Sequence, residues 1–539
     1  MVIPPRPASV TANGCPDALL PATANGRLGP YPADDFEIAT GATVPTRITP
    51  SALYYFRHEC IAVPRPGIAS AGFARHTRTL DDVIAWSRAP RQDDREDRPP
   101  LILLGAPLRA DLAHLSRDTR TVTLSGTTRP FALAPRLALN RSWFDASSAA
   151  FLSRRPLRLR ASVDGGTIVG RSFWPTDFRI GEDLPFAPLS PDLPPTLGLR
   201  EAMREDPCGG AQLPFAGRII RERAGSAREW KDKPALAVIV NGAQGDDDEA
   251  WAGHFAVGTG RIGADGAIAD LLVNNFYALD IVSEKGILAA PVPLDGYFGD
   301  LNSGQAWYRP SFILIATLRD DTVPRRIQGA FNRVYQQLWR HQLEYRHSTM
   351  NCTGISVDVL RALGWSVPSR PSRQALRAWL AIPWTLAREH SISKARMASE
   401  YLSEDATRLF PAAAFEEIGA DLLRLAASAA DSRDGPLATM LAGAVESLLL
   451  LRIPQIPSSR TFGTAPVVAA DEYRGVVPGN PADMQIVPVP PRPFPPELRD
   501  DDLLPSPRKP SDIPLATWIA AVAVVAVAGA WMLIRALLA

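Results

Sequence analysis

The C-terminal end of the chain contains its most constraining feature, an uncharged run from Leu515 to Ile534. The run reads LATWIAAVAVVAVAGAWMLI, and at about 1.5 Å per residue it just crosses a hydrocarbon core of about 30 Å. Trp518 and Trp531 fall near the two interfaces, where indole rings prefer to lie. A buried core helix is the alternative, which the terminal position after a proline-rich stretch disfavours. We therefore expect a transmembrane anchor over 513–539, with the bulk of the chain on the cytoplasmic side.

Composition limits what the rest of the chain can be. At 539 residues it is too long for a single hydrophobic core and predicts two or three folded units. The net charge is +1 and no basic stripe is present, so nucleic acid is not an expected partner. No signal for secretion precedes the folded part. The four cysteines are widely spaced without CxxC pairs, which argues against a disulfide framework or structural zinc: Cys15, Cys60, Cys208 and Cys352.

Shifts in composition predict the order of the units. The N-terminal half mixes strand-like runs such as RTVTLSG with a helix-like LDDVIAW. The second half has long apolar strands followed by helical patterns, so the predicted fold class is α+β. The predicted units are an irregular tail at 1–50, a mixed α/β or α+β unit at 51–216, a second unit at 217–370, a helical segment at 371–452 and a Pro-rich tether at 453–512.

The second unit carries the candidate chemistry on strands and one helix. Strands are predicted at 235–243 and 309–318, and a hairpin joins 253–260 to 267–280. The acidic loop Asp246–Glu249 lacks the ligand spacing of a calcium loop, so we interpret it as a solvated loop. No metal or organic cofactor is expected.

The stretch HSTMNCTGISVDVLRALGW places Cys352 at a predicted helix start. Ile355 and Val359 begin an apolar face with a period of four, Asn351 is a suitable N-cap, and Gly364 is a suitable stop. The first-turn amides would point at the sulfur, stabilise a thiolate and offer donors to an oxyanion. The alternative is a buried, inert cysteine.

His254 is the candidate base. It follows a glycine at the start of the apolar strand GHFAVGTG, whereas the other histidines lie in polar or arginine-rich surroundings. A turn near residue 264 would place it opposite Asn274 or Asn275, and an asparagine could orient one ring nitrogen while the other takes the thiol proton. Strand register leaves the choice of asparagine open. The alternatives are a structural histidine at this position and His347 as a rival base.

Together these motifs resemble the circularly permuted papain-like fold, in which a His-bearing strand precedes the Cys-bearing helix. This NlpC/P60-related superfamily includes the lecithin:retinol acyltransferase-like enzymes. The likeness is greatest to the catalytic domain of bacterial lipoprotein intramolecular acyltransferase-like proteins. The matching features are GHFAVG, the acidic turn TLRDD, a helix from about Val323, Tyr345, and Asn351 to Thr353, within residues 235–365. The resemblance implies an antiparallel sheet with a Cys-bearing helix, joined here to the N-terminal unit, the helical segment, the tether and the anchor.

The resemblance also implies a reaction. Cys352 would be the nucleophile and His254 the base, with Asn275 or Asn274 orienting the ring and Asn351 or Tyr345 assisting at the oxyanion. We predict acyl transfer or hydrolysis on a lipid-linked ester, thioester or amide at the bilayer. The family enzymes work outside the cytoplasm, and the N-terminal unit and the anchor have no counterpart in them, so the substrate is not carried over.

Two other functions fit the same residues. One is a cysteine peptidase or peptidoglycan-type amidase of the same fold, acting on a peptide substrate. The other is a non-enzymatic tail-anchored scaffold in which Cys352 is merely packed. The apolar stretches ALRAWLAIPWTLA and PLATMLAGAVESLLLL allow an acyl groove or a membrane-surface role, but we interpret them first as helices of the core.

Overall fold

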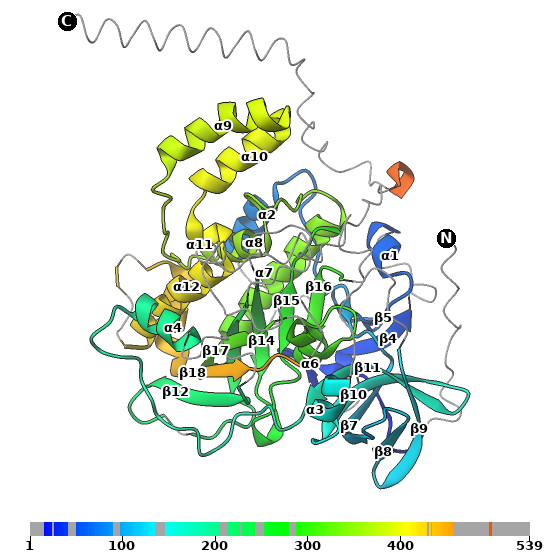
Figure 1. Cartoon of the computed structure of the whole chain (residues 1–539). Coiled ribbons are helices and arrows are strands. Elements are labelled where there is room, and N and C mark those ends of the chain that lie inside the picture. Colours follow the sequence, from blue (N-terminus) through cyan, green and yellow to red (C-terminus); the bar gives the residue numbers. More distant parts are fainter. Residues whose placement is uncertain are drawn as a thin grey trace, which may run out of the picture.

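The computed structural model describes the chain in segments: 16–23, 26–40, 50–89, 98–134, 146–204, 213–226, 228–242, 253–279, 287–307, 309–427, 431–432, 434–457 and 495–498. Its centre is a seven-stranded antiparallel sheet (Figure 1). The strands in spatial order are β12 (Ala216–Glu222), β18 (Val445–Ile453), β17 (Ser311–Leu318), β13 (Pro234–Asn241), β14 (His254–Arg261), β15 (Leu272–Asn275) and β16 (Ala290–Pro293).

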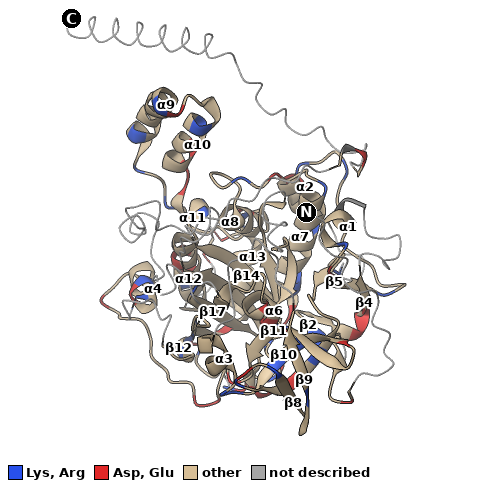
Figure 2. Ribbon diagram, turned by 45° about the vertical axis from the view of Figure 1, so that its right-hand side comes forward, with Lys and Arg blue, Asp and Glu red and all other residues tan. Residues whose placement is uncertain are grey.

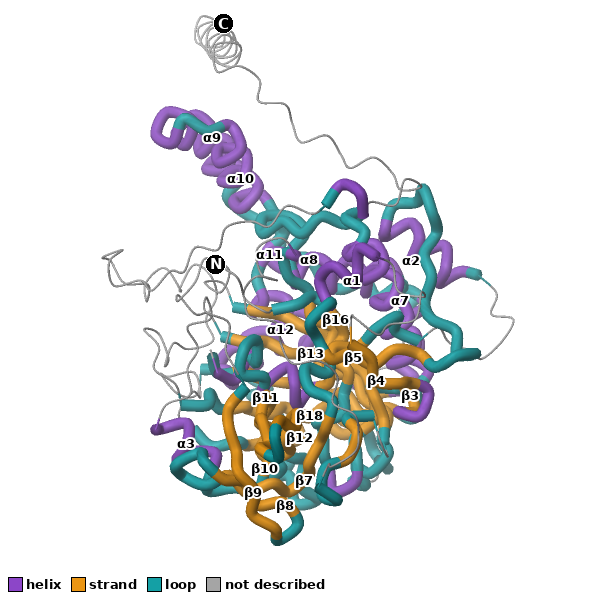
Figure 3. Tube along the Cα trace, turned by 90° about the vertical axis from the view of Figure 1, so that its right-hand side faces the viewer, coloured by secondary structure: helices purple, strands orange, loops and turns teal. Residues whose placement is uncertain are grey.

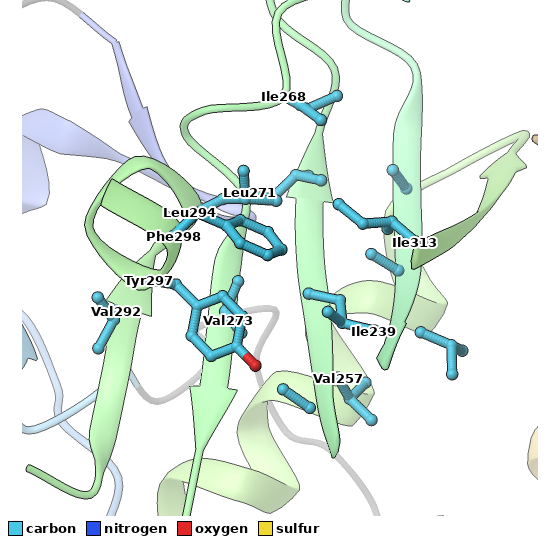
Figure 4. Packing of buried hydrophobic residues seen from close by; sticks show 14 of the residues in the cluster. Ile239, Val257, Ile268, Leu271, Val273, Val292, Leu294, Tyr297, Phe298 and Ile313 are labelled. Carbon is cyan, nitrogen blue, oxygen red and sulfur yellow. The ribbon is translucent and has the colours of Figure 1, made fainter. Parts of the chain in front are cut away.

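The middle of this sheet is the most apolar part of the molecule. Every residue of β13 and β17 is buried, because the runs ALAVIV and FILIA have neighbours on both faces. Figure 4 shows aliphatic side chains of neighbouring strands in contact, among them Ile239, Val257 and Val273. The helices that pack on these strands are α7 (Thr322–Trp339), α8 (Cys352–Ala362) and α12 (Pro411–Ala427).

A second β structure lies N-terminal to the central sheet. Five strands close into a barrel because β7 pairs with both β8 and β10, while β9 and β11 pair in parallel. This is a small Greek-key barrel of the OB type. Leu112, with φ 59°, lies at the bulge where the pairing of β7 with β10 shifts register. The barrel elements are β7 (Leu108–Leu115), β8 (Thr121–Leu124), β9 (Thr127–Leu133), α3 (Ala146–Leu152), β10 (Leu157–Asp164) and β11 (Thr167–Pro175).

Shorter elements connect the barrel to the central sheet. Residues 16–40, which we expected to be irregular, contain four strands, and β1 extends the barrel through β7. The remaining elements are β1 (Leu20–Pro21), β2 (Arg27–Leu28), β3 (Tyr31–Pro32), β4 (Phe36–Thr40), α1 (Pro50–Phe56), β5 (Cys60–Pro64), α2 (Thr79–Arg88), β6 (Ile102–Leu103), α4 (Pro195–Met203), α6 (Leu294–Gly299), α11 (Ala406–Leu409) and α13 (Pro436–Ala444).

The predicted fold class, an α+β chain built from separate units, is wrong. The structure is mixed α/β with several sheets, and one continuous core joins residues of the barrel, the central sheet and the segment after 371. Across the residues that the structure describes, no helix is long and apolar enough to cross a membrane. Leu515–Ile534 and most of the Pro-rich tether lie outside those residues. Composition marks loops, whereas the core is continuous across them.

The two apolar stretches after residue 371 differ from expectation. Half of PLATMLAGAVESLLLL forms α13, but VESLLLL forms β18 between β12 and β17, with Leu449 opposite Ile315. A continuous run of leucines has no periodicity that distinguishes a helix from a strand. Here the run forms a strand because it pairs with β12 on one side and β17 on the other. The other stretch does form a helix, α9 (Ala375–Glu389), but with α10 (Ile392–Ser403) it projects from the body (Figure 3) and is not in the core.

Candidate active site

His254 is the first residue of β14 and lies directly opposite Asn241 on β13. Its Nε2 is 2.7 Å from Oδ1 of Asn275, on the neighbouring strand. An amide oxygen can only accept, so Nε2 donates its proton and Nδ1 is left with a lone pair. The ring of Tyr277 stacks on the imidazole with centroids 4.3 Å apart, which fixes the ring plane. The imidazole is therefore held as the tautomer that can accept a proton at Nδ1.

The strand separates the roles of the two candidate asparagines. Successive strand residues point to opposite faces, so only Asn275 reaches the imidazole. The Asn274 amide instead donates to the carbonyl of Val257 at 3.1 Å and exchanges two hydrogen bonds of 2.9 Å with Gln328 of α7. Asn275 orients His254, and Asn274 belongs to a buried polar network that fastens α7 to the sheet.

Cys352 is the first residue of α8, as the sequence predicts, and Asn351 is its N-cap. The Asn351 side chain accepts a hydrogen bond of 2.8 Å from the Gly354 amide. Its Nδ2 donates to the carbonyls of His347 at 2.9 Å and Leu409 at 3.1 Å. Both ends of the Asn351 amide are occupied, so this residue fixes the helix start and is not a donor aimed at the thiol.

The Cys352 sulfur lies against the start of β14. The backbone N–H of Phe255, the residue after His254, faces it closely enough to oppose the rise in the pKa of the thiol, and Thr353 Oγ1 is 3.8 Å away. The Cys352 backbone N–H donates to the Tyr345 hydroxyl at 3.3 Å, and that hydroxyl also hydrogen-bonds to the sulfur. Within the described residues, Asn275 is the imidazole's hydrogen-bond partner and no hydrogen bond joins the imidazole to the sulfur. The fold thus brings base and thiol to one place without joining them.

Burial sets the charge state of the pair. His254 is 2% exposed and Cys352 is 4% exposed. Burial lowers the pKa of His254 to about 3, helped by the Arg309 cation, while the Asn275 bond opposes this shift. Burial also raises the pKa of the Cys352 thiol, against the hydrogen bonds that favour the thiolate. At neutral pH both groups are uncharged in this state, so they do not form a thiolate–imidazolium pair.

Further residues line the site that sequence reasoning did not name. Tyr297 of α6 donates a hydrogen bond to Asn241 Oδ1, and Asn241 Nδ2 donates to Ser311 Oγ at 2.7 Å. The Tyr297 ring centroid is 6.3 Å from that of His254, and Figure 4 shows this ring beside Val273. Burial raises the pKa of Tyr297 well above its usual value, so the phenol stays neutral.

The sequence offered a signal for one of these residues. Tyr277 lies two positions after Asn275, and alternation along the strand predicted at 267–280 puts both on the imidazole side, although β15 itself ends at Asn275. Tyr297 and Asn241 carry no local signal, because only tertiary packing brings α6 over the sheet.

The remaining candidates are placed as follows. The His347 ring packs edge-on against Tyr345, with centroids 5.2 Å apart, so it contacts the site through that phenol. Within the described part of the chain, no cluster of His, Cys, Asp and Glu side chains has the arrangement of a metal site. Asp246–Glu249, Cys15 and Cys208 fall in segments that the structure does not describe.

Comparison with known proteins leaves the family open, since no family model, curated protein or solved structure matches the chain.

Proposed function

We propose that this chain is a thiol enzyme that transfers or hydrolyses acyl groups through a thioester on Cys352. The observation that carries the proposal is the arrangement at the start of β14. Asn275 holds the His254 imidazole with Nδ1 available, and the next amide along β14, that of Phe255, faces the sulfur at the first turn of α8. Thiol catalysis requires this combination of oriented base, thiol and helix N-terminus.

The neutral resting state favours proton transfer during attack. As the sulfur adds to the carbonyl carbon, Nδ1 of His254 takes the thiol proton and a tetrahedral oxyanion forms. The oxyanion collapses, the bond to the leaving alcohol, thiol or amine breaks, and the imidazolium gives its proton to that group. Water or an acceptor hydroxyl or amine then attacks the thioester, losing its proton to His254, and the free thiol is restored.

Two donors stand beside the sulfur for the oxyanion. The Cys352 backbone N–H and the Tyr345 hydroxyl are 3.3 Å apart and bonded to each other, so an incoming carbonyl oxygen would replace that mutual bond. Donors positioned where charge develops contribute strongly in a site without water. We assign Tyr345 to this role and Asn351 to fixing the helix.

The proposed reaction requires that a substrate can reach the Cys352 sulfur. The sulfur is almost fully buried, so a substrate acyl chain reaches it only when covering residues move. The resemblance to lipoprotein acyltransferase-like enzymes carries over only the Cys/His chemistry, and a lipid-linked ester, thioester or amide is our own proposal for the substrate class. The segment Leu515–Ile534, from which we predicted a membrane location, lies outside the described residues. The proposed thiol chemistry does not depend on that location.

Trapping the acyl-enzyme tests the proposal. The purified chain is incubated with p-nitrophenyl esters of increasing acyl length, and its intact mass and Cys-containing peptides are measured. We expect one acyl adduct on Cys352, absent in Cys352→Ser and slowed at least 100-fold in His254→Ala. Adducts that spread over other nucleophiles, or that persist in Cys352→Ser, would refute the assignment.

The burial of the sulfur also favours a non-enzymatic role in which Cys352 is packed and inert. This alternative predicts no adduct with any ester and a Cys352→Ala variant that differs only in stability. The acyl-chain length of the ester distinguishes the enzymatic from the non-enzymatic role. An enzyme for lipid-linked acyl groups reacts faster with longer acyl chains, whereas a packed thiol stays unreactive with all of them.

A further inference from the structure

The helical hairpin α9–α10 exposes an apolar stripe that the fold does not use. Its large apolar side chains are far more exposed than the apolar residues of the core: Trp379 is 61% exposed and Trp384 is 71% exposed. The two helices pack on each other and neither packs extensively on another described element. The remaining members of the stripe are Leu376, Leu380 and, on α10, Met397.

The stripe runs along one side of α9. At 100° per residue, Leu376, Leu380 and Trp384 fall within one quadrant, and Trp379 adjoins it. The opposite side, including Ala378, packs against α10, where Ala395 is buried. The hairpin is therefore held together by small residues on its inside and presents its largest residues outward.

Basic side chains border the stripe on one edge. Arg388, four residues after Trp384, and Arg377, three residues before Leu380, lie on the same edge of the stripe. Arg377 has no ion-pair partner among the described residues, whereas Arg388 is 3.7 Å from Glu389. From 373 to 403 the hairpin has five Lys or Arg against two Glu, in a chain that is otherwise almost neutral. Figure 2 shows Lys and Arg positions, in blue, on the ribbons of both helices.

We infer that the α9–α10 hairpin docks on an anionic lipid surface. A tryptophan-rich stripe with a cationic border is what a helix needs to lie in a bilayer interface, with indoles at the headgroup level and arginines at the phosphates. The positive border favours this occupant over a second copy of the chain, whose hairpin would bring like charges together. The inference is independent of the thiol chemistry.

The base of the hairpin adjoins the candidate active site. Ser348, in the turn before Asn351, donates a hydrogen bond of 2.7 Å to Glu400 of α10. Arg408, just after the hairpin, donates to the carbonyl of Thr349 at 3.1 Å. A hairpin seated on a bilayer would therefore hold the Cys352 turn close to the lipid surface.

The test measures lipid contact at the hairpin itself. The full-length chain is mixed with vesicles of phosphatidylcholine alone or with added phosphatidylglycerol, and amide hydrogen exchange is followed in peptides of α9 and α10. We expect slower exchange in α9 with the anionic vesicles and a smaller effect with phosphatidylcholine alone. Trp379→Ser/Trp384→Ser should weaken this protection at least tenfold, and Arg377→Gln about fivefold on anionic vesicles only.

The control is Phe186→Ser, which removes an exposed aromatic residue outside the hairpin and should leave the protection unchanged. Equal exchange of α9 with and without vesicles would overturn the inference. Protection of α9 that is already present before vesicles are added and that Trp379→Ser/Trp384→Ser removes would also overturn it, because another surface would then cover the stripe. In that case dependence on protein concentration would identify a second copy as the occupant, and its absence would identify another segment of the same chain.

Discussion

At the residue scale, two neighbouring asparagines provide a matched test of the site. Asn275→Ala removes the oxygen that holds His254, so we expect acyl-adduct formation on Cys352 to slow on the order of 100-fold, with a loss of about 1–3 kcal/mol of unfolding free energy because the buried Nε2–H loses its acceptor. Asn274→Ala removes two of the four hydrogen bonds of the Gln328 side chain, which should cost about 1–3 kcal/mol of unfolding free energy and leave the adduct rate of the folded protein unchanged. Urea unfolding checks that the two variants lose similar stability, and the adduct rate then separates them: equal rates in both variants would contradict the assignment.

A second residue-scale prediction follows from the buried imidazole. The folded pKa of His254 is about 3, below the usual value near 6.5, so the neutral ring stabilises the fold above about pH 6.5 and this contribution is lost as pH falls toward 3. Between pH 7 and pH 4.5 the loss is about 2–3 kcal/mol. His254→Gln has no such titration, so its unfolding free energy in urea should fall less over this interval. Parallel pH profiles of the two proteins would show that His254 is not buried as a neutral ring.

At the element scale, the end of α8 depends on a glycine. Gly364 has φ +88°, and a Cβ there would lie 2.4 Å from Pro436 at the start of α13. Gly364→Ala therefore adds a clash to the strain of a left-handed conformation, and we expect a loss of about 3 kcal/mol or more. Gly225 has φ +83° and open space around it, so Gly225→Ala should cost only about 1–2 kcal/mol. Thermal or urea unfolding compares the two, and similar losses would mean that the Pro436 contact relaxes.

The elements also show what could be predicted from the sequence. The start of α8 at Cys352, its Asn351 cap and the strand that begins at His254 are confirmed, because capping chemistry and local periodicity specify them. VESLLLL was predicted as helix and is a strand, because only its neighbours β12 and β17 select between the two. The position of Tyr297 beside His254 was missed for the same reason, since it depends on how α6 crosses the sheet.

At the scale of the whole molecule, buried ion pairs join the barrel to the central sheet. Arg160 of β10 donates to Asp295 of α6 at 2.8 Å, with both side chains about 1% exposed. Arg171 of β11 pairs with Asp300 and Glu59 at 2.7 Å each. Composition predicted a domain boundary between the barrel and the central sheet. No local sequence pattern could reveal that charged residues on the two sides of this boundary form ion pairs. We therefore expect barrel and sheet to unfold in one cooperative transition.

A double-mutant cycle on Arg160 and Asp295 tests this coupling. Asp295→Leu leaves a buried guanidinium whose two terminal nitrogens have no hydrogen-bond partner among the described residues, so we expect a loss of about 3–5 kcal/mol. Arg160→Met leaves the carboxylate buried and should cost a similar amount. The double variant should recover most of the loss, because no uncompensated charge remains. Urea unfolding of the three variants gives the coupling energy, and simple addition of the two single losses would mean that the pair does not hold barrel and sheet together.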